Sequence, residues 1–143
     1  AGSASLTEVM RVGTDSGGKV GIGTTAPNST LQVNGSVSVK YLPASAGSSS
    51  IPTAGATIIG VSGGSATVEL AGADCVEGRI IFIKNESVDS NIAITTQSAG
   101  SIDGNTSGPE TPGVSISSLD SLQLYAKGNN IWFILGKYTS PGY

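Results

Sequence analysis

Few side chains in this sequence could act as nucleophiles, bases or metal ligands. The sequence contains no histidine and one cysteine, Cys75. Without histidine, neither a Ser-His-Asp triad nor a Cys-His pair can form, and a transition metal lacks its usual nitrogen ligand. Asp74 and Glu77 lie close to Cys75 in sequence, and anionic neighbours disfavour the reactive thiolate. We therefore interpret Cys75 as a structural thiol.

The acidic residues are spaced singly and lie mostly in expected turns. A glycosidase needs two carboxylates that face the same sugar bond, and no such pair is evident in the sequence. A catalytic pair made of acids from two different subunits is the one arrangement that the sequence leaves open. We predict a protein that is not an enzyme and has no catalytic residue, no metal site and no cofactor.

Two glycine-containing segments superficially resemble ligand-binding loops. Gly21-Ile22-Gly23-Thr24-Thr25 lacks the lysine and the following helix of a phosphate-binding loop. Ile102-Asp103-Gly104-Asn105 lacks the spaced acidic ligands of a calcium loop. We interpret the first as a tight β-crossing and the second as a turn that begins with aspartate.

Exposed aromatic and amide side chains near the C-terminus are the best candidates for ligand contacts. Tyr125 and Tyr138 flank the last two expected strands, and Asn129 and Asn130 lie in the turn between those strands. We predict these four residues as the receptor-binding site. Trp132 lies inside an apolar run, which predicts a core position instead.

Composition excludes several classes of protein. Only 12% of the 143 residues are charged and the net charge is −3, so no basic patch is available for nucleic acid. A lone cysteine forms no intrachain disulfide, and no apolar run approaches the roughly 20 residues of a membrane-spanning helix. We expect neither nucleic-acid binding nor membrane insertion. The small, polar N-terminus does not resemble a secretory signal. The abrupt, collar-like beginning suggests the C-terminal piece of a longer protein.

The chain divides into three expected zones. Residues 1–42 form a short, glycine-rich β segment, residues 43–56 form a linker of Pro, Ser, Ala and Gly, and residues 57–143 form a β-rich head. Short β-prone runs recur in the head between glycine-rich turns, a pattern typical of a β-sandwich or barrel-like fold. The expected head strands are residues 57–61, 66–70, 79–84, 91–95, 114–117, 121–126 and 131–135.

Two of these runs are apolar on both faces instead of alternating. They are Arg79-Ile80-Ile81-Phe82-Ile83 and Ile131-Trp132-Phe133-Ile134-Leu135. Such strands are typically buried on both faces, by a second sheet or by a neighbouring subunit. The N-terminal β segment is likewise too short and too polar to bury a core alone. These features together predict a homo-oligomer with a shared core.

The segment from Glu8 to Lys40 closely resembles the collar that links stalk to head in bacteriophage tail fibres. The matching residues are Glu8, Met10, Arg11, Gly18, Val20, Gly21, Ile22, Gly23, Thr24, Thr25, Pro27, Leu31, Val33 and Gly35. The head also resembles, more loosely, a module of phage fibres and related surface proteins. Its matching residues include Gly78, Arg79, Ile81, Ile83, Lys84, Asn85, Ile102, Asp103, Gly104, Leu122, Leu124, Trp132 and Ile134.

The resemblance implies a structural virion protein that forms the distal part of a phage tail fibre. Such a homotrimer would work outside the cell, attach to a host-surface receptor such as a glycan, and contact other tail components. Three weak sites on one tip would gain avidity through effective concentration. The alternatives are a trimeric collar, spacer or decoration domain that does not bind a receptor, and a bacterial surface adhesin. A fibre-borne glycan hydrolase ranks last.

Overall fold

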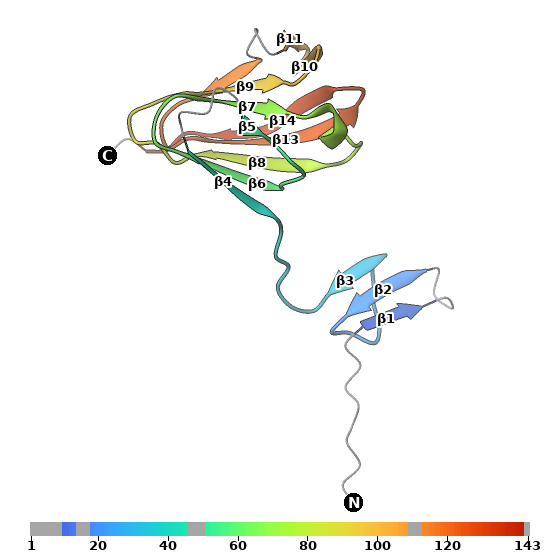
Figure 1. The fold of residues 1–143 in the computed structure, drawn as a ribbon. Coiled ribbons are helices and arrows are strands. Elements are labelled where there is room, and N and C mark those ends of the chain that lie inside the picture. Colours follow the sequence, from blue (N-terminus) through green and yellow to red (C-terminus); the bar gives the residue numbers. More distant parts are fainter. Residues whose placement is uncertain (1–9, 14–17, 46–50, 109–112, 142–143) are drawn as a thin grey trace, which may run out of the picture. The chain divides into compact units, whose positions relative to one another are not determined.

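The computed structural model describes residues 10–13, 18–45, 51–108 and 113–141, and its fold is all-β (Figure 1). The all-β prediction is confirmed. The chain forms two compact units, Ala1–Ser38 and Val39–Tyr143, which we call the collar and the head. Among the described residues, no helix is long and apolar enough to cross a membrane.

The collar is one small three-stranded sheet. β1 (Met10–Gly13) pairs antiparallel with β2 (Lys19–Ile22), and β2 pairs parallel with β3 (Leu31–Val33). Gly21 in β2 lies against the crossing segment, since a Cβ there would come within 2.6 Å of the Thr24 carbonyl oxygen. Glycine is therefore required at position 21 for this tight crossing, as the sequence predicts.

The head consists of two sheets that face each other (Figure 1). The larger has the order β11-β10-β14-β13-β8-β6-β4 and the smaller has the order β12-β9-β7-β5. In chain order the strands are β4 (Tyr41–Ser45), β5 (Ile51–Pro52), β6 (Ile58–Ser62), β7 (Ala66–Leu70), β8 (Ile80–Asn85), β9 (Ile92–Thr96), β10 (Gly100–Ile102), β11 (Asn105–Ser107), β12 (Val114–Ile116), β13 (Ser121–Gly128) and β14 (Ile131–Tyr138), with the 3₁₀ turn η1 (Gly72–Asp74) between β7 and β8.

The core of the head lies between the two sheets. Alternate residues of each strand point inward, as the side-chain period of a strand requires. The largest fully buried side chains are Trp132, Ile59, Leu70, Ile81, Ile83, Ile92, Ile94, Ile102, Ile116, Leu122, Leu124 and Val61. Trp132 is 0% exposed, which confirms its predicted core position.

The strand boundaries agree closely with the sequence pattern in most of the head but differ at its start. The structure divides the chain after Ser38, and β4 covers the first part of the expected linker by pairing parallel with β6. The run Ser36–Lys40, in which serine and valine alternate, forms no strand. Residues 46–50 of the expected linker lie outside the described residues. β4 is an edge strand of the larger sheet and pairs only with β6. Proline has no N–H donor but is tolerated in an edge strand, so Pro43 is compatible with this pairing.

The two all-apolar runs are not buried on both faces within the chain. In β8, Ile81 and Ile83 are fully buried, whereas Ile80 is 41% exposed and Phe82 is 42% exposed. In β14, Leu135 is 52% exposed. Of the two ways of burial that the sequence predicts, a second sheet covers only one face of each strand, and burial of the other face by a neighbouring subunit stays a prediction. One face of each strand packs on the smaller sheet, and nothing among the described residues covers the other.

Candidate functional site

The four predicted receptor-binding residues come from the last hairpin of the head but do not form one site. Asn129 and Asn130 have φ of 52° and 58°, and they make the two-residue turn between β13 and β14. This geometry is that of a type I′ turn, in which asparagine is favoured at positive φ. Asn129 is exposed at the tip of this hairpin.

The side chain of Asn130 is engaged within the protein. Its Nδ2 lies 2.9 Å from the Ser98 carbonyl oxygen, 3.0 Å from the Ser98 hydroxyl and 3.1 Å from the Ala99 carbonyl oxygen. The backbone carbonyl oxygen of Asn130 accepts a hydrogen bond from the Ser101 N–H at 3.1 Å. Asn130 therefore ties the hairpin to the loop before β10, and its amide donors are occupied there.

Tyr125 and Tyr138 belong to a different surface. Tyr125 stacks on Phe133, with ring centroids 5.5 Å apart and an interplanar angle of 21°. Tyr138 is 62% exposed at the opposite end of β14 from the Asn129-Asn130 turn. Both tyrosines lie on the face of the larger sheet that points away from the core. The structure thus separates the two tyrosines from the two asparagines.

The collar has an apolar surface that was not among the binding residues predicted from the sequence. The register pairs Met10 with Ile22 and Val12 with Val20, and it aligns Val20 with Leu31. Paired residues project to the same face, so one face of the sheet is made of six apolar side chains. They are Met10, Val12, Val20, Ile22, Leu31 and Val33.

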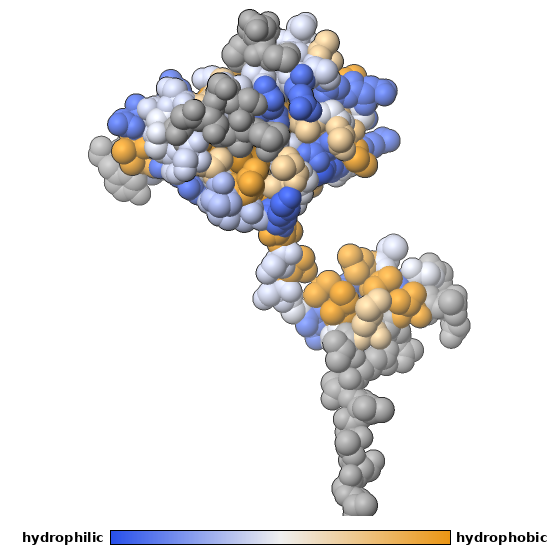
Figure 2. Space-filling view, in the orientation of Figure 1, coloured by the Kyte–Doolittle hydropathy of each residue, from blue (hydrophilic) through white to orange (hydrophobic). Residues whose placement is uncertain are grey.

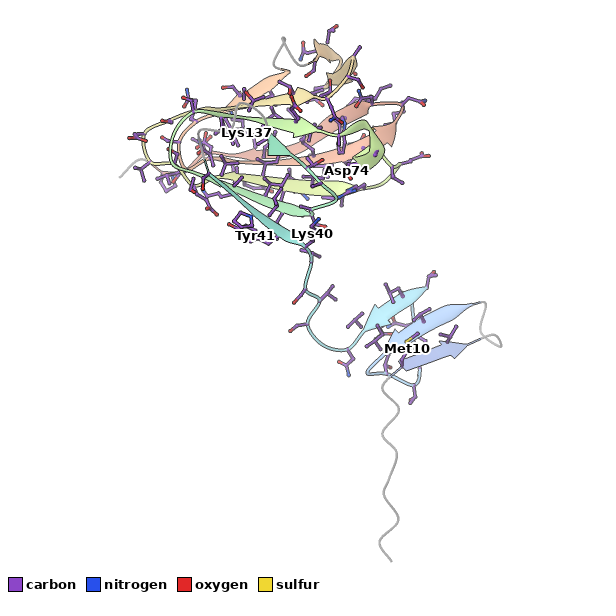
Figure 3. All side chains as sticks on the ribbon, viewed as in Figure 1. Met10, Lys40, Tyr41, Asp74 and Lys137 are labelled. Carbon is purple, nitrogen blue, oxygen red and sulfur yellow. The ribbon has the colours of Figure 1, made fainter. Side chains whose placement is uncertain are left out.

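This collar face is open to solvent. Met10 is 59%, Val12 60% and Leu31 61% exposed. Figure 2 shows apolar side chains gathered over the three-stranded sheet, and Met10 is labelled in Figure 3. The sequence contains a signal for this face, because apolar residues alternate with other residues in each of the three short strands. The apolar positions of that alternation include Val12, Val20 and Val33.

One ionic network crosses the end of the head where η1 meets β8. The Asp74 carboxylate accepts hydrogen bonds from the Thr53 hydroxyl, from the Gly55 N–H at 3.1 Å and from Arg79 Nη1 at 2.7 Å. Burial by itself raises the Asp74 pKa, but the Thr53 and Gly55 hydrogen bonds and the Arg79 charge outweigh it. The net effect holds the Asp74 pKa below its usual value.

Arg79 completes this network by donating from Nη2 to the Ala56 carbonyl oxygen at 3.0 Å. The network therefore joins the β5–β6 loop, η1 and β8. All the polar atoms of Asp74 face protein groups rather than a cleft, which is the arrangement of a structural ion pair. We assign the network to the stability of the head.

A second polar contact lies on the outer side of β4. The Tyr41 hydroxyl donates to the Glu86 carboxylate at 3.3 Å, and both side chains lie over Gly60. Partial desolvation and the Glu86 charge raise the Tyr41 pKa. Figure 3 labels Tyr41 beside Lys40 at the start of β4. A Cβ at position 60 would come within 2.5 Å of the Tyr41 hydroxyl, so glycine leaves room for this contact.

The predicted structural role of Cys75 agrees with its environment. Cys75 is buried, and its Sγ lies 3.5 Å from the Ile131 carbonyl oxygen. Within the described ranges, no three His, Cys, Asp or Glu side chains are close enough together to hold a metal ion.

Comparisons with protein-family models, with curated proteins and with solved structures gave no match.

Proposed function

We propose that this chain is a non-enzymatic, homotrimeric attachment protein, the distal part of a phage tail fibre. The observation that carries the proposal is the uncovered apolar face of the collar. Six apolar side chains share this face, and three of them are about 60% exposed.

A three-stranded sheet of three- and four-residue strands cannot bury this face by itself. Independent stability of so small a sheet requires packing of its apolar face against another element. Among the described residues, the opposite face is covered at Gly21 by the crossing segment at Thr24, and no described element covers the apolar face. A partner must therefore cover the collar.

A second and third copy of the same chain are the partners that suit this face best. The face carries no charged side chain that would select an oppositely charged partner. Identical subunits associate through closed symmetry and supply equal apolar faces at equal concentration. The number three is the one implied by the resemblance of Glu8–Lys40 to fibre collars.

Attachment would then be a property of the assembled heads. Three identical heads on one collar present three copies of any receptor site, and avidity multiplies weak binding at each site. The polar loops of the head suit hydrogen bonding to a host-surface receptor such as a glycan.

The mass of the assembled protein tests this proposal. Native mass spectrometry should give three times the 14.1 kDa chain, about 42 kDa. Leu31→Asp places a charge on the apolar collar face at a position that is 61% exposed, and we expect this variant to be monomeric at micromolar concentration.

Thr30→Asp is the matched control, because Thr30 is exposed, adjacent in sequence and outside the apolar face. It should remain trimeric. A wild-type chain that stays at 14.1 kDa would overturn the proposal. Binding of the trimer, but not of the monomeric variant, to host cells or to a glycan array then tests attachment.

A spacer or decoration domain is the second candidate, and one observation favours it. The four residues expected to bind a receptor do not converge, since Asn130 is engaged by Ser98 and Tyr138 lies at the far end of β14. A trimer that binds no host surface would support the spacer.

A further inference from the structure

The two outer faces of the head differ sharply in chemistry. On the smaller sheet, the outward residues of three adjacent strands are Thr67, Ala93 and Ser115, which the register aligns in one row. These small side chains, with Ser65 and Asn91, line a shallow hollow of about 320 Å³. This outer face is suited to water.

The outer face of the larger sheet is apolar and aromatic. One row across β14, β13 and β8 consists of Phe133, Tyr125 and Ile80. The next row across β13, β8 and β6 consists of Gln123, Phe82 and Ile58. We call the apolar members of these rows, together with Leu135 and Tyr138, the outer sheet patch.

The patch is exposed although it lies at the centre of the sheet. Phe82 on β8 is 42% exposed, and its neighbours across the sheet are Ile58 on β6 and the uncharged Gln123 on β13. Monomeric soluble proteins rarely leave an apolar surface of this extent open, and such patches usually mark interaction sites. The smaller sheet of the same head shows that a polar outer face is compatible with this fold.

Two polar side chains beside the patch are already engaged within the protein. Lys84 Nζ donates to the Leu119 carbonyl oxygen, and the Tyr41 hydroxyl is engaged by Glu86. Lys127 Nζ lies 5.9 Å from the centre of the Phe133 ring, a cation–π distance. A sugar needs polar partners around its stacking platform, whereas an apolar protein surface does not. The apolar side chains of the patch therefore favour a protein partner over a sugar.

The short connection between collar and head makes another copy of this chain the nearest protein partner for the patch. Seven residues, Asn34–Lys40, separate β3 of the collar from β4 of the head, and seven residues span at most about 25 Å. Collar association therefore holds the heads of different copies within a few nanometres of one another. Their effective concentration reaches the millimolar range, where even a weak apolar contact forms.

We propose that the outer sheet patch packs against the head of a second copy of this chain, so that the heads as well as the collars are joined. This inference rests on the proposed homotrimer. It adds that attachment uses the polar loops and the smaller sheet, because the larger sheet lies inside the assembly.

Hydroxyl-radical footprinting of the full chain tests the inference. Phe82, Leu135 and Tyr138 should be labelled at least about threefold less in the wild-type trimer than in the Leu31→Asp monomer. Val76 and Val88, which are 61% and 74% exposed in loops, are the internal controls and should be labelled equally in both. Protection of the buried Trp132 in both proteins reports that each head is folded.

Substitution in the patch gives an independent measurement. Phe82→Ser should lower the midpoint of thermal unfolding of the trimer by several degrees, yet leave that of the Leu31→Asp monomer unchanged or raised. Val88→Ser, at an exposed loop position, should change neither. Equal labelling of Phe82 in a wild-type protein of trimeric mass would overturn this inference while leaving the trimer intact. Protection of the patch only after a glycan is added would also overturn it.

Discussion

At the scale of single residues, Asp74 is a buried charged group in the head whose carboxylate is fully engaged by other residues. It is 7% exposed and accepts hydrogen bonds from three residues in two segments of the chain, Thr53 and Gly55 in the β5–β6 loop and Arg79 just before β8. A buried carboxylate is tolerated only when such partners replace the water that it loses. The cost of removing its charge should therefore exceed that of an ordinary surface substitution.

Asp74→Asn should destabilise the head by about 2 kcal/mol. The amide preserves the shape but leaves Arg79 Nη1 without a carboxylate. Glu77→Gln is the matched control, because it removes one negative charge from an exposed position in the next turn. Urea denaturation followed by Trp132 fluorescence measures both variants; equal losses would contradict a structural role for the network.

The difference in stability between wild type and Asp74→Asn should depend on pH in a defined way. The Asp74 pKa is lowered in the folded state, so its contribution is fully present above the unfolded pKa of about 3.9. That contribution is lost as the pH falls through the folded pKa, where the folded carboxylate becomes protonated. The stability difference between wild type and Asp74→Asn should therefore be constant from pH 7 to 5 and shrink below about pH 4. A difference that grows on acidification would contradict this sign.

At the scale of elements, the join between β10 and β14 depends on one glycine. A Cβ at Gly100 would lie 2.4 Å from the Asn130 carbonyl oxygen, which is backbone and cannot swing away. Gly108, after β11, has no atom within 4 Å of its position for a Cβ.

Gly100→Ala should therefore cost about 1–3 kcal/mol, as overpacking usually does, and Gly108→Ala should cost about zero. Thermal unfolding of the two variants at the same protein concentration provides the comparison. If Gly100→Ala were as stable as Gly108→Ala, the close approach of β10 to the Asn129-Asn130 hairpin would be incorrect.

The sequence predicts elements well wherever apolar residues alternate over five or more positions. Ala66–Leu70 is predicted to the residue because inward Val68 and Leu70 alternate with outward Thr67 and Glu69. β10 and β11 were not predicted, since three-residue strands around Asp103-Gly104 have too few positions to show a period. Their pairing depends on contacts with β14, which are distant in sequence.

The candidate site was harder to predict than the elements, for a related reason. Tyr125 and Tyr138 look equivalent to Asn129 and Asn130 in sequence, because all four flank one hairpin. Only the three-dimensional register shows that the tyrosines share a sheet face and that Ser98 engages Asn130. The all-apolar run of β8 predicts burial on both faces, and in the single chain only Ile81 and Ile83 are buried.

At the scale of the whole molecule, each unit carries an apolar surface that a single copy leaves exposed. If copies of the chain cover these surfaces, folding and assembly are linked, and stability depends on protein concentration. The thermal midpoint of the wild-type chain should rise measurably over a hundredfold increase in concentration. That of Leu31→Asp should not, and a concentration-independent wild type would argue for a monomer.

The position of β4 has a mechanical consequence. Any tension along the chain between the two units reaches the head first at Lys40, whose carbonyl oxygen accepts hydrogen bonds from the Thr57 and Ile58 N–H groups. From there it passes into the five register pairs of β4 with β6. A pull along the strand axis would load these pairs together in shear instead of opening them one by one. The parallel pairing of this edge strand thus makes the head resist force at the point where a tether would apply it.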